Sequence, residues 1–320
     1  MRKLLAAILL LVSSTLQAQA PAYPSQPIRV LVPYAPGGAV DTATRILTQK
    51  MTERLGWNFV IDNRPGGNGF IAVGAAAKAP ADGYTLLMAS GGELALNPAL
   101  FPSVPYDVDR DFVPISMVND SPMLFIANTS APFNTFQELV AAAKARPGTI
   151  AYSSAGAGSM NHLAGESLAL AAGVKLLHIP YKGGAPAAAA IAAGDVPFGV
   201  AAIPGAIPHL KSGKTKVIGL TTAKRTSVDG TWGTPREAGL ADVDVSIWVG
   251  LLAPKGTPDA VVERLNAEVR RTLEQPDVQK RFNDLGSDVA PMTSAEFANR
   301  IRTAAGQYRK IVGSAGMKAE

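Results

Sequence analysis

The feature that most constrains the fold is a regular alternation of short apolar stretches with segments of helical periodicity. Ile28–Val32, Asn58–Asp62 and Tyr84–Ser90 each read as a buried strand. The segment between the first two has apolar residues at helical spacing and ends at Gly56, and an Ala-rich helix is expected near Phe70–Ala79. Strands separated by helices in this order pair in parallel through right-handed crossovers.

The same alternation restarts past the middle of the chain. Met123–Asn128, Thr149–Ser154 and Lys175–Tyr181 read as strands, with helices expected over Thr135–Gly148 and Ser159–Ala172. Two such runs in 320 residues predict two α/β lobes, since one ordinary core is smaller than this chain requires.

The C-terminal part reads as helical. Thr257 is predicted as an N-cap with Pro258 at the first helical position, and Thr293 and Glu296 form a predicted capping box.

Two similar turns follow strands 147 residues apart: "VPYAPGG" at Val32–Gly38 and "IPYKGG" at Ile179–Gly184. Ligands of open parallel sheets bind beyond the C-terminal ends of the strands. Two lobes that each present such a turn are therefore expected to face each other across a binding cleft.

The N-terminus has the layout of a signal peptide. Arg2 and Lys3 precede the apolar run Leu4–Val12, which is too short to span a bilayer, and small residues follow it. Cleavage after Ala18 or Ala20 fits, and we take residues 1–18 as the signal peptide. The mature protein is then expected to be exported.

Composition removes several classes of function. The chain has no cysteine, so disulfides and thiolate chemistry are ruled out. The net charge of +5 falls to +3 without Arg2 and Lys3, and no basic stripe with interleaved aromatic residues supports nucleic-acid binding.

Glycine-rich turns before helices are the candidate binding elements. In "SSAGAGSMNHLAGE", free N–H groups at a helix start near Ser159 would favour an anion, and a plain strand-to-helix turn capped by Ser159 is the alternative. In "YAPGGAVD", Asp41 is read either as a helix-start partner that pairs with Arg45 or as a ligand contact. Asn97 is read either as a turn residue or as a ligand donor.

Catalytic templates do not fit. The Gly213-Lys214-Thr215 triplet has Pro208 where a phosphate-binding loop needs glycine, and the chain has no G-x-S-x-G or H-E-x-x-H motif. His162 beside the Gly-rich turn is read as a packing or hydrogen-bonding residue rather than a general base. We expect no catalytic residue, no metal and no cofactor.

Several long motifs together resemble one known family. They include "YPSQPIRVLVPYAPGGAVDTATRIL", "VIDNRPGGNGFIAVGAAAKAPADGYTLL", "YSSAGAGSMNHLAGE" and "WVGLLAPKGTPDAVVERLNAEV", in order over about residues 23–320. The chain resembles the TctC-like, or Bug, periplasmic solute-binding proteins of tripartite tricarboxylate transporters.

The resemblance implies a two-lobed periplasmic-binding-protein fold of type II, the Venus flytrap, each lobe a mainly parallel sheet flanked by helices. Lobe 1 would comprise residues 19–122 and 248–320, and lobe 2 residues 123–247, joined by strands near Pro114–Ser121 and Val243–Leu251. The implied monomer captures a small carboxylate (a di- or tricarboxylate, an acidic amino acid or an aromatic acid) and passes it to membrane subunits.

The resemblance and the turn chemistry nominate a set of ligand-binding residues. They are Tyr34, Ala35, Pro36, Gly37, Gly38, Asp41, Ser90, Asn97, Ser154, Ala155, Gly156, Gly158, Ser159, His162, Tyr181, Lys182, Gly183 and Ala202. Neutral donors, chiefly backbone N–H groups around Gly156–Met160, are expected to hold the carboxylate.

The chain departs from the family pattern in the predicted second lobe. Pro197 and Ala201 stand where acidic residues are common, and Asp229–Thr234 replaces an "LPDVPT"-like segment. These departures leave the identity of the carboxylate open. Two alternatives to transport remain: a receptor that feeds a membrane sensor, and an exported enzyme on a similar fold.

Overall fold

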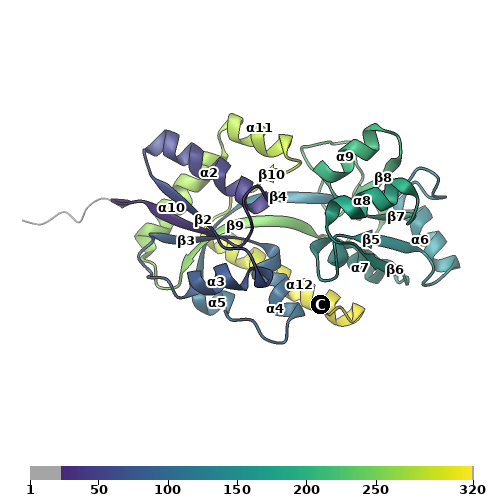
Figure 1. Cartoon of the computed structure of the whole chain (residues 1–320), viewed down its shortest axis with the longest axis horizontal. Helices are drawn as coiled ribbons and strands as arrows, with labels where there is room; N and C mark the ends of the chain where they lie inside the picture. The colour runs from purple at the N-terminus through teal and green to yellow at the C-terminus, as the bar shows by residue number, and fades with distance from the viewer. Residues whose placement is uncertain (1–22, 319–320) are drawn as a thin grey trace, which may run out of the picture.

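The computed structural model describes residues 23–318 as two α/β halves joined by two long strands (Figure 1). The expected two-lobed α/β architecture is confirmed. The predicted signal peptide and its cleavage site lie outside the described residues.

In the first half, the predicted strands pair in parallel. β1(Ile28–Val32) lies between β2(Phe59–Asn63) and β3(Thr85–Ser90) and is parallel to both. Beyond β3 the sheet continues with antiparallel strands, because β3 pairs with β9(Ser246–Pro254) and β9 with β4(Phe112–Asn128). The carboxyl ends of β1, β2 and β3 therefore share one edge of the sheet.

The second half repeats this plan. β5(Ala151–Ser154) is parallel to β6(Leu177–Pro180), as the alternation predicts, and also to β7(Phe198–Ala202). β4 closes the sheet in the antiparallel sense against β7 and β8(Thr215–Leu220).

β4 is the strand that both halves share. It pairs with β9 from Phe112 to Pro122 and then with β7 and β8 from Met123 onward. The sequence predicted Met123–Asn128 as one strand and a separate strand near Pro114–Ser121 that joins the lobes, whereas the structure has a single strand through both. The structure accommodates Pro114 beside a register shift and Pro122 at the point where β4 changes partners.

The remaining elements are helices that cover the sheets, short helical turns and one short strand. These elements are α2(Ala39–Leu55), η2(Gly67–Gly69), α3(Phe70–Ala77), η3(Gly92–Leu96), α4(Asn97–Leu100), α5(Val108–Asp111), α6(Phe136–Ala145), α7(Met160–Ala172), α8(Gly184–Ala193), α9(Ile203–Lys211), η4(Arg236–Ala238), α10(Asp259–Leu273), α11(Pro276–Asp284), the short strand β10(Asp288–Val289) and α12(Ser294–Ala315).

Of the two helix starts predicted in the C-terminal part, one is confirmed and one is wrong. The capping box is confirmed, since Thr293 and Glu296 each bind the other's backbone N–H. The prediction for Thr257 is wrong: α10 begins at Asp259 with Pro258 at the cap position. The Thr257 hydroxyl instead donates to the Pro254 carbonyl at 2.8 Å, which closes the turn after β9.

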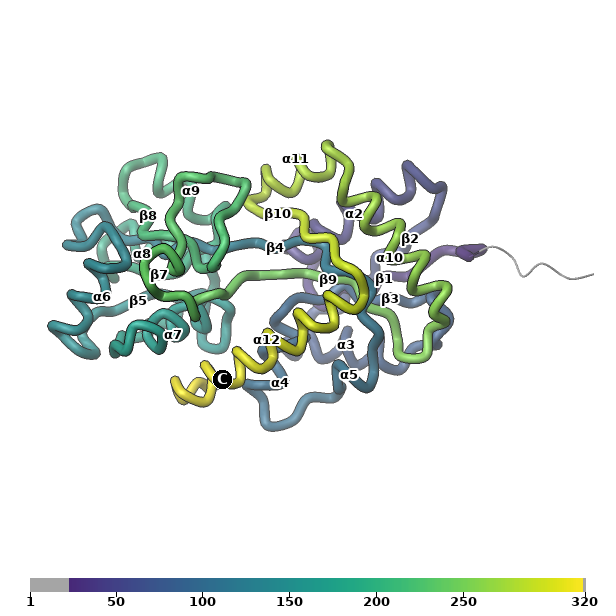
Figure 2. The backbone as a smooth tube through the Cα atoms, turned by 180° about the vertical axis from the view of Figure 1, so that it is seen from behind, coloured from purple at the N-terminus to yellow at the C-terminus, as the bar shows by residue number. Residues whose placement is uncertain are grey.

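The long C-terminal helix α12 contacts both halves. It runs along the back of the molecule (Figure 2), where it packs on β4 and η3 of the first half and on α7 of the second.

One buried aromatic residue supports the segment after β3. Trp248 of β9 is fully buried and donates from Nε1 to the Tyr308 hydroxyl of α12 at 3.2 Å. A Cβ added to Gly91 would lie 2.6 Å from the Trp248 ring. Glycine at this position therefore lets the start of η3 lie directly against the indole.

Candidate ligand-binding cleft

A cavity of about 480 Å³ opens between the two halves. Most of its wall comes from the turns after β1, β2 and β3, and the start of α7 supplies the opposite side. The lining residues are Pro33, Tyr34, Ala35, Ala39, Val40, Pro65, Gly66, Asn68, Gly69, Ser90, Gly92, Glu93, Leu96, Asn97, Gly158, Ser159, Met160, Asn161 and Ile247.

A buried glutamate lies in this wall. Glu93, in the π-helix η3, is 2% exposed, and its Oε1 accepts a hydrogen bond from the Tyr34 hydroxyl at 2.5 Å. Its Oε2 accepts from both the backbone N–H and the hydroxyl of Ser90, each at 2.8 Å. Burial raises the pKa of Glu93, against the opposing effect of these hydrogen bonds. The carboxyl group is thus fixed by three neutral donors.

The loop after β2 packs directly on Glu93. Gly69 has φ +86°, and a Cβ there would lie 2.7 Å from Glu93 Cγ. The Asn97 side chain holds this loop by donating to the Asn68 carbonyl at 2.8 Å. Asn97 therefore lines the cavity and fixes a neighbouring turn, and its role as a ligand donor stays a prediction.

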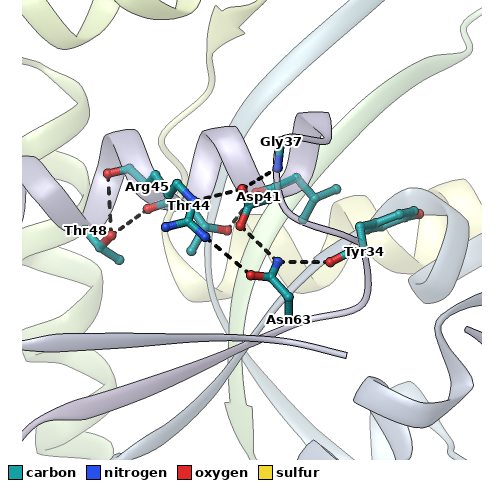
Figure 3. A network of polar contacts seen from close by, with 8 residues as sticks. Tyr34, Gly37, Asp41, Thr44, Arg45, Thr48 and Asn63 are labelled. Carbon is teal, nitrogen blue, oxygen red and sulfur yellow. Dashed lines mark hydrogen bonds and ion pairs between the residues drawn. The ribbon is translucent and has the colours of Figure 1, made fainter. Parts of the chain in front are cut away.

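The turn after β1 is shaped by a second buried carboxylate (Figure 3). Asp41 is 1% exposed and accepts from Gly37 N–H at 2.8 Å, Arg45 Nε at 2.8 Å and Asn63 Nδ2 at 2.9 Å. Burial opposes its ionisation, but these hydrogen bonds outweigh burial and lower the pKa of Asp41. Asn63 also donates to the Tyr34 carbonyl at 2.9 Å. The predicted Asp41–Arg45 pair is confirmed, and the Gly37 N–H is directed at Asp41.

The start of α7 follows the capping interpretation. The Ser159 hydroxyl accepts from His162 N–H at 3.1 Å and donates to the Gly156 carbonyl at 2.7 Å. The Gly158 N–H donates to His162 Nδ1 at 3.1 Å. At the first two helical positions, Met160 and Asn161 have N–H groups with no acceptor inside the helix, and both residues line the cavity.

Two stacked imidazoles lie behind this turn. The rings of His162 and His178 are 3.7 Å apart between centroids, and Ser154 Oγ is 2.6 Å from His178 Nε2. Burial lowers the pKa of both histidines to about 4. Neither histidine lines the cavity, so the pair positions the turn from behind.

The second Pro-Tyr turn supports the same Gly-rich segment. Tyr181 N–H donates to the Ser154 carbonyl at 3.1 Å, and Gly183 N–H donates to the Ala155 carbonyl at 3.1 Å. The Lys182 side chain is exposed. The two similar turns therefore differ in position: the first lines the cavity, and the second supports its far wall.

The structure brings six of the nominated residues into the cavity wall, namely Tyr34, Ala35, Ser90, Asn97, Gly158 and Ser159. It places the other nominated residues outside that wall: Pro36, Gly37, Gly38, Asp41, Ser154, Ala155, Gly156, His162, Tyr181, Lys182, Gly183 and Ala202. A ligand-binding role for any of them stays a prediction. The sequence nominated the backbone near Met160 but not the side chains of Glu93, Asn161 and Ile247, although Glu93 stands only three residues beyond β3.

With this geometry, comparison with known proteins decides the family. A family model described as "Tripartite tricarboxylate transporter family receptor" matches residues 43–317. The chain belongs to this family. It is a solute-binding receptor of the periplasmic type, as the sequence resemblance implied.

Relatives match nearly the whole chain. A Pseudomonas protein from the tcbD-tcbE intergenic region is 37% identical over 314 residues, 97% of this chain and 93% of that protein. A Rhodopseudomonas palustris structure with adipate has TM-score 0.77 and 30% identity, covering 92% of this chain and 99% of that one. MatC from the same species, with bound malate, has TM-score 0.73 and 32% identity, covering 91% and 100%.

Within residues 23–318, no helix combines the length and apolar character needed to cross a membrane. The same residues contain no cluster of three or more His, Asp or Glu side chains arranged to hold a metal ion.

Proposed function

We propose that this protein is a periplasmic receptor that captures a small carboxylate between its halves and delivers it to the membrane subunits of a tripartite tricarboxylate transporter. Family membership and the adipate and malate complexes of its relatives support this proposal. The proposed role is binding and delivery, without a chemical step.

The observation that carries the proposal is the convergence of two helix starts on one cavity. Ala39 and Val40 at the start of α2, and Met160 and Asn161 at the start of α7, all line it. N–H groups in a first helical turn lack intrahelical acceptors, and the helix dipole favours an anion there. Donors from both halves could hold one carboxylate without a cationic side chain.

We propose that the ligand closes the halves about β4 and β9, with residues 19–122 and 248–320 in one lobe and 123–247 in the other. The two halves already meet beside the cavity, since a Cβ on Gly158 would lie 2.8 Å from Leu100. Closure would bring the two helix starts onto the same ligand. Small-angle scattering should show a smaller radius of gyration with a verified ligand, and an unchanged radius at saturation would contradict closure.

A thermal-shift screen of carboxylic acids tests the binding function, because a ligand that binds the folded state raises the melting temperature. Calorimetry with an acid found in this way should then compare two variants. Gly158→Val should weaken binding more than roughly tenfold, since φ is +71° and the new side chain would meet Leu100. Lys182→Ala is the comparison and should weaken binding less than Gly158→Val, because the Lys182 side chain is exposed and outside the cavity wall.

The result that contradicts this assignment is loss of binding in Lys182→Ala with normal binding in Gly158→Val. The carboxylate would then be held by an ion pair at the exposed second Pro-Tyr turn, outside the cavity.

Export and a monomeric state complete the proposal. Mass spectrometry of periplasmic protein should find a mature N-terminus at Gln19 or Pro21, and gel filtration should give a monomer near the mass of one chain. An intact Met1 terminus in the membrane fraction would contradict export.

A further inference from the structure

The cavity wall has an unusual charge for a site that binds an anion. Among the described residues 23–318 that line it, Glu93 is the one charged side chain, and no Lys, Arg or His is present. The ion pairs of the same part of the chain do not include Glu93. A ligand therefore meets this carboxyl group without a compensating cation.

Glu93 is held rigidly at this position. The Ser90 N–H is a fixed backbone donor to Oε2, and the Tyr34 hydroxyl donates to Oε1. Gly69 closes one side, because a Cβ there would lie 3.1 Å from Oε1. The side chain consequently cannot swing away from a ligand group that approaches it.

We propose that Glu93 restricts the cavity to acids that carry one carboxylate on an uncharged body, and that it excludes a second carboxylate. This inference rests on the proposed carboxylate-binding function. Pro33, Val40, Leu96, Met160 and Ile247 give the cavity apolar wall for such a body.

Electrostatics and hydrogen bonding both disfavour a diacid. Two carboxylates in a partly desolvated site repel each other far more strongly than in water. The alternative is a Glu93 protonated at Oε1 that donates to the ligand. The Tyr34 hydroxyl, which donates to Oε1 in the structure, would then have a much weaker acceptor, so the second carboxylate is disfavoured in either protonation state.

A hydrogen-bond donor on the ligand, unlike a second carboxylate, is compatible with Glu93 at this end of the cavity. Oε2 already accepts two hydrogen bonds, whereas Oε1 accepts one and keeps a lone pair. A hydroxyl or amide N–H on the ligand body could donate to it. The preferred ligand is therefore a monocarboxylate whose far end is apolar or carries a donor.

Matched acids test this inference in the wild-type protein. Hexanoate and adipate differ at one end by a second carboxylate, as do benzoate and terephthalate. Calorimetric titration should give the diacid of each pair a dissociation constant at least roughly tenfold larger than that of its monoacid.

The variant Glu93→Gln removes the charge and keeps the size. Its amide oxygen can accept from Ser90 N–H while its NH₂ group donates to the Tyr34 hydroxyl oxygen, so the turn is preserved. In this variant the dissociation constants of the diacid and the monoacid should differ by no more than about threefold. Glu268→Gln is the control, because it removes a mostly buried carboxylate that pairs with Arg54 away from the cavity, and it should keep the wild-type ratio.

The outcomes separate the two proposals. If no acid of the thermal-shift screen binds, the carboxylate-binding function fails and this inference fails with it; if the screen finds only diacids and neither hexanoate nor benzoate binds, this inference alone fails. If adipate binds the wild type as tightly as hexanoate, or if Glu93→Gln keeps the wild-type ratio, the role of Glu93 alone is overturned. Should Glu93→Gln not fold, the wild-type comparison of both pairs still decides.

Discussion

Acidification should destabilise this protein through the stacked pair His162 and His178. The pKa of each is lowered to about 4 in the folded state, chiefly by burial, and for His162 the neighbouring imidazole contributes to this value. An unfolded histidine has a pKa near 6.5. Between these values the unfolded chain binds more protons, so stability is complete above about pH 6.5 and is lost as the pH falls toward 4.

The magnitude follows from the shift. One histidine with these two pKa values loses about 2 kcal/mol of folding free energy between pH 7.5 and pH 5, and two lose about 4. His178 is only half-buried, and solvent screens part of this effect. We therefore expect about 2 kcal/mol for the pair. Glu166, 3.8 Å from His162, acts in the opposite sense, because burial raises its pKa.

The assay isolates the histidines from other titrating groups. Urea unfolding at pH 7.5 and pH 5 gives the loss of stability for the wild type and for the double variant His162→Gln, His178→Gln. The double variant should lose about 2 kcal/mol less than the wild type over this range. His209→Gln is the control and should follow the wild type. Equal losses in the wild type and the double variant would refute the reasoning.

Three further substitutions should act on stability. Gly91→Ala should cost about 1–3 kcal/mol in urea unfolding, because its Cβ would lie 2.6 Å from the Trp248 ring. Asp41→Asn should cost about 1–3 kcal/mol, since it weakens the pairing with Arg45 and leaves the turn after β1 less firmly held, and calorimetry should also show weaker carboxylate binding. Thr293→Ala removes a helix cap and should cost about 0.5–2 kcal/mol with carboxylate affinity unchanged, as thermal unfolding and calorimetry would show.

Much of the fold follows from local sequence patterns. The parallel strands and the helices between them were predictable because each carries its own periodicity and ends in Gly or Pro. A joining strand near Pro114–Ser121 was expected, but its union with Met123–Asn128 into one strand was not, since Pro122 is acceptable only at a change of partner strand. That is a tertiary circumstance that a local pattern does not contain.

The candidate site was also predictable only in part. The Ser159 cap and the Asp41–Arg45 pair were predictable, because both depend on residues three or four positions apart. The place of Glu93 was not, because its burial depends on Tyr34 and Gly69 from two other turns. The second Pro-Tyr turn was assigned to the ligand by its similarity to the first, whereas its backbone supports the Gly-rich segment.

The packing of α12 against both halves has a consequence for affinity. Gln307 donates to the Asp242 carbonyl at 3.3 Å and to the Asp244 carbonyl at 3.4 Å, which ties the helix to the chain entering β9. If the ligand closes the halves as we propose, their relative rotation shifts the contact between α7 and α12. The packing of these two helices then contributes to the balance of open and closed forms, so that part of the ligand affinity depends on residues outside the cavity wall.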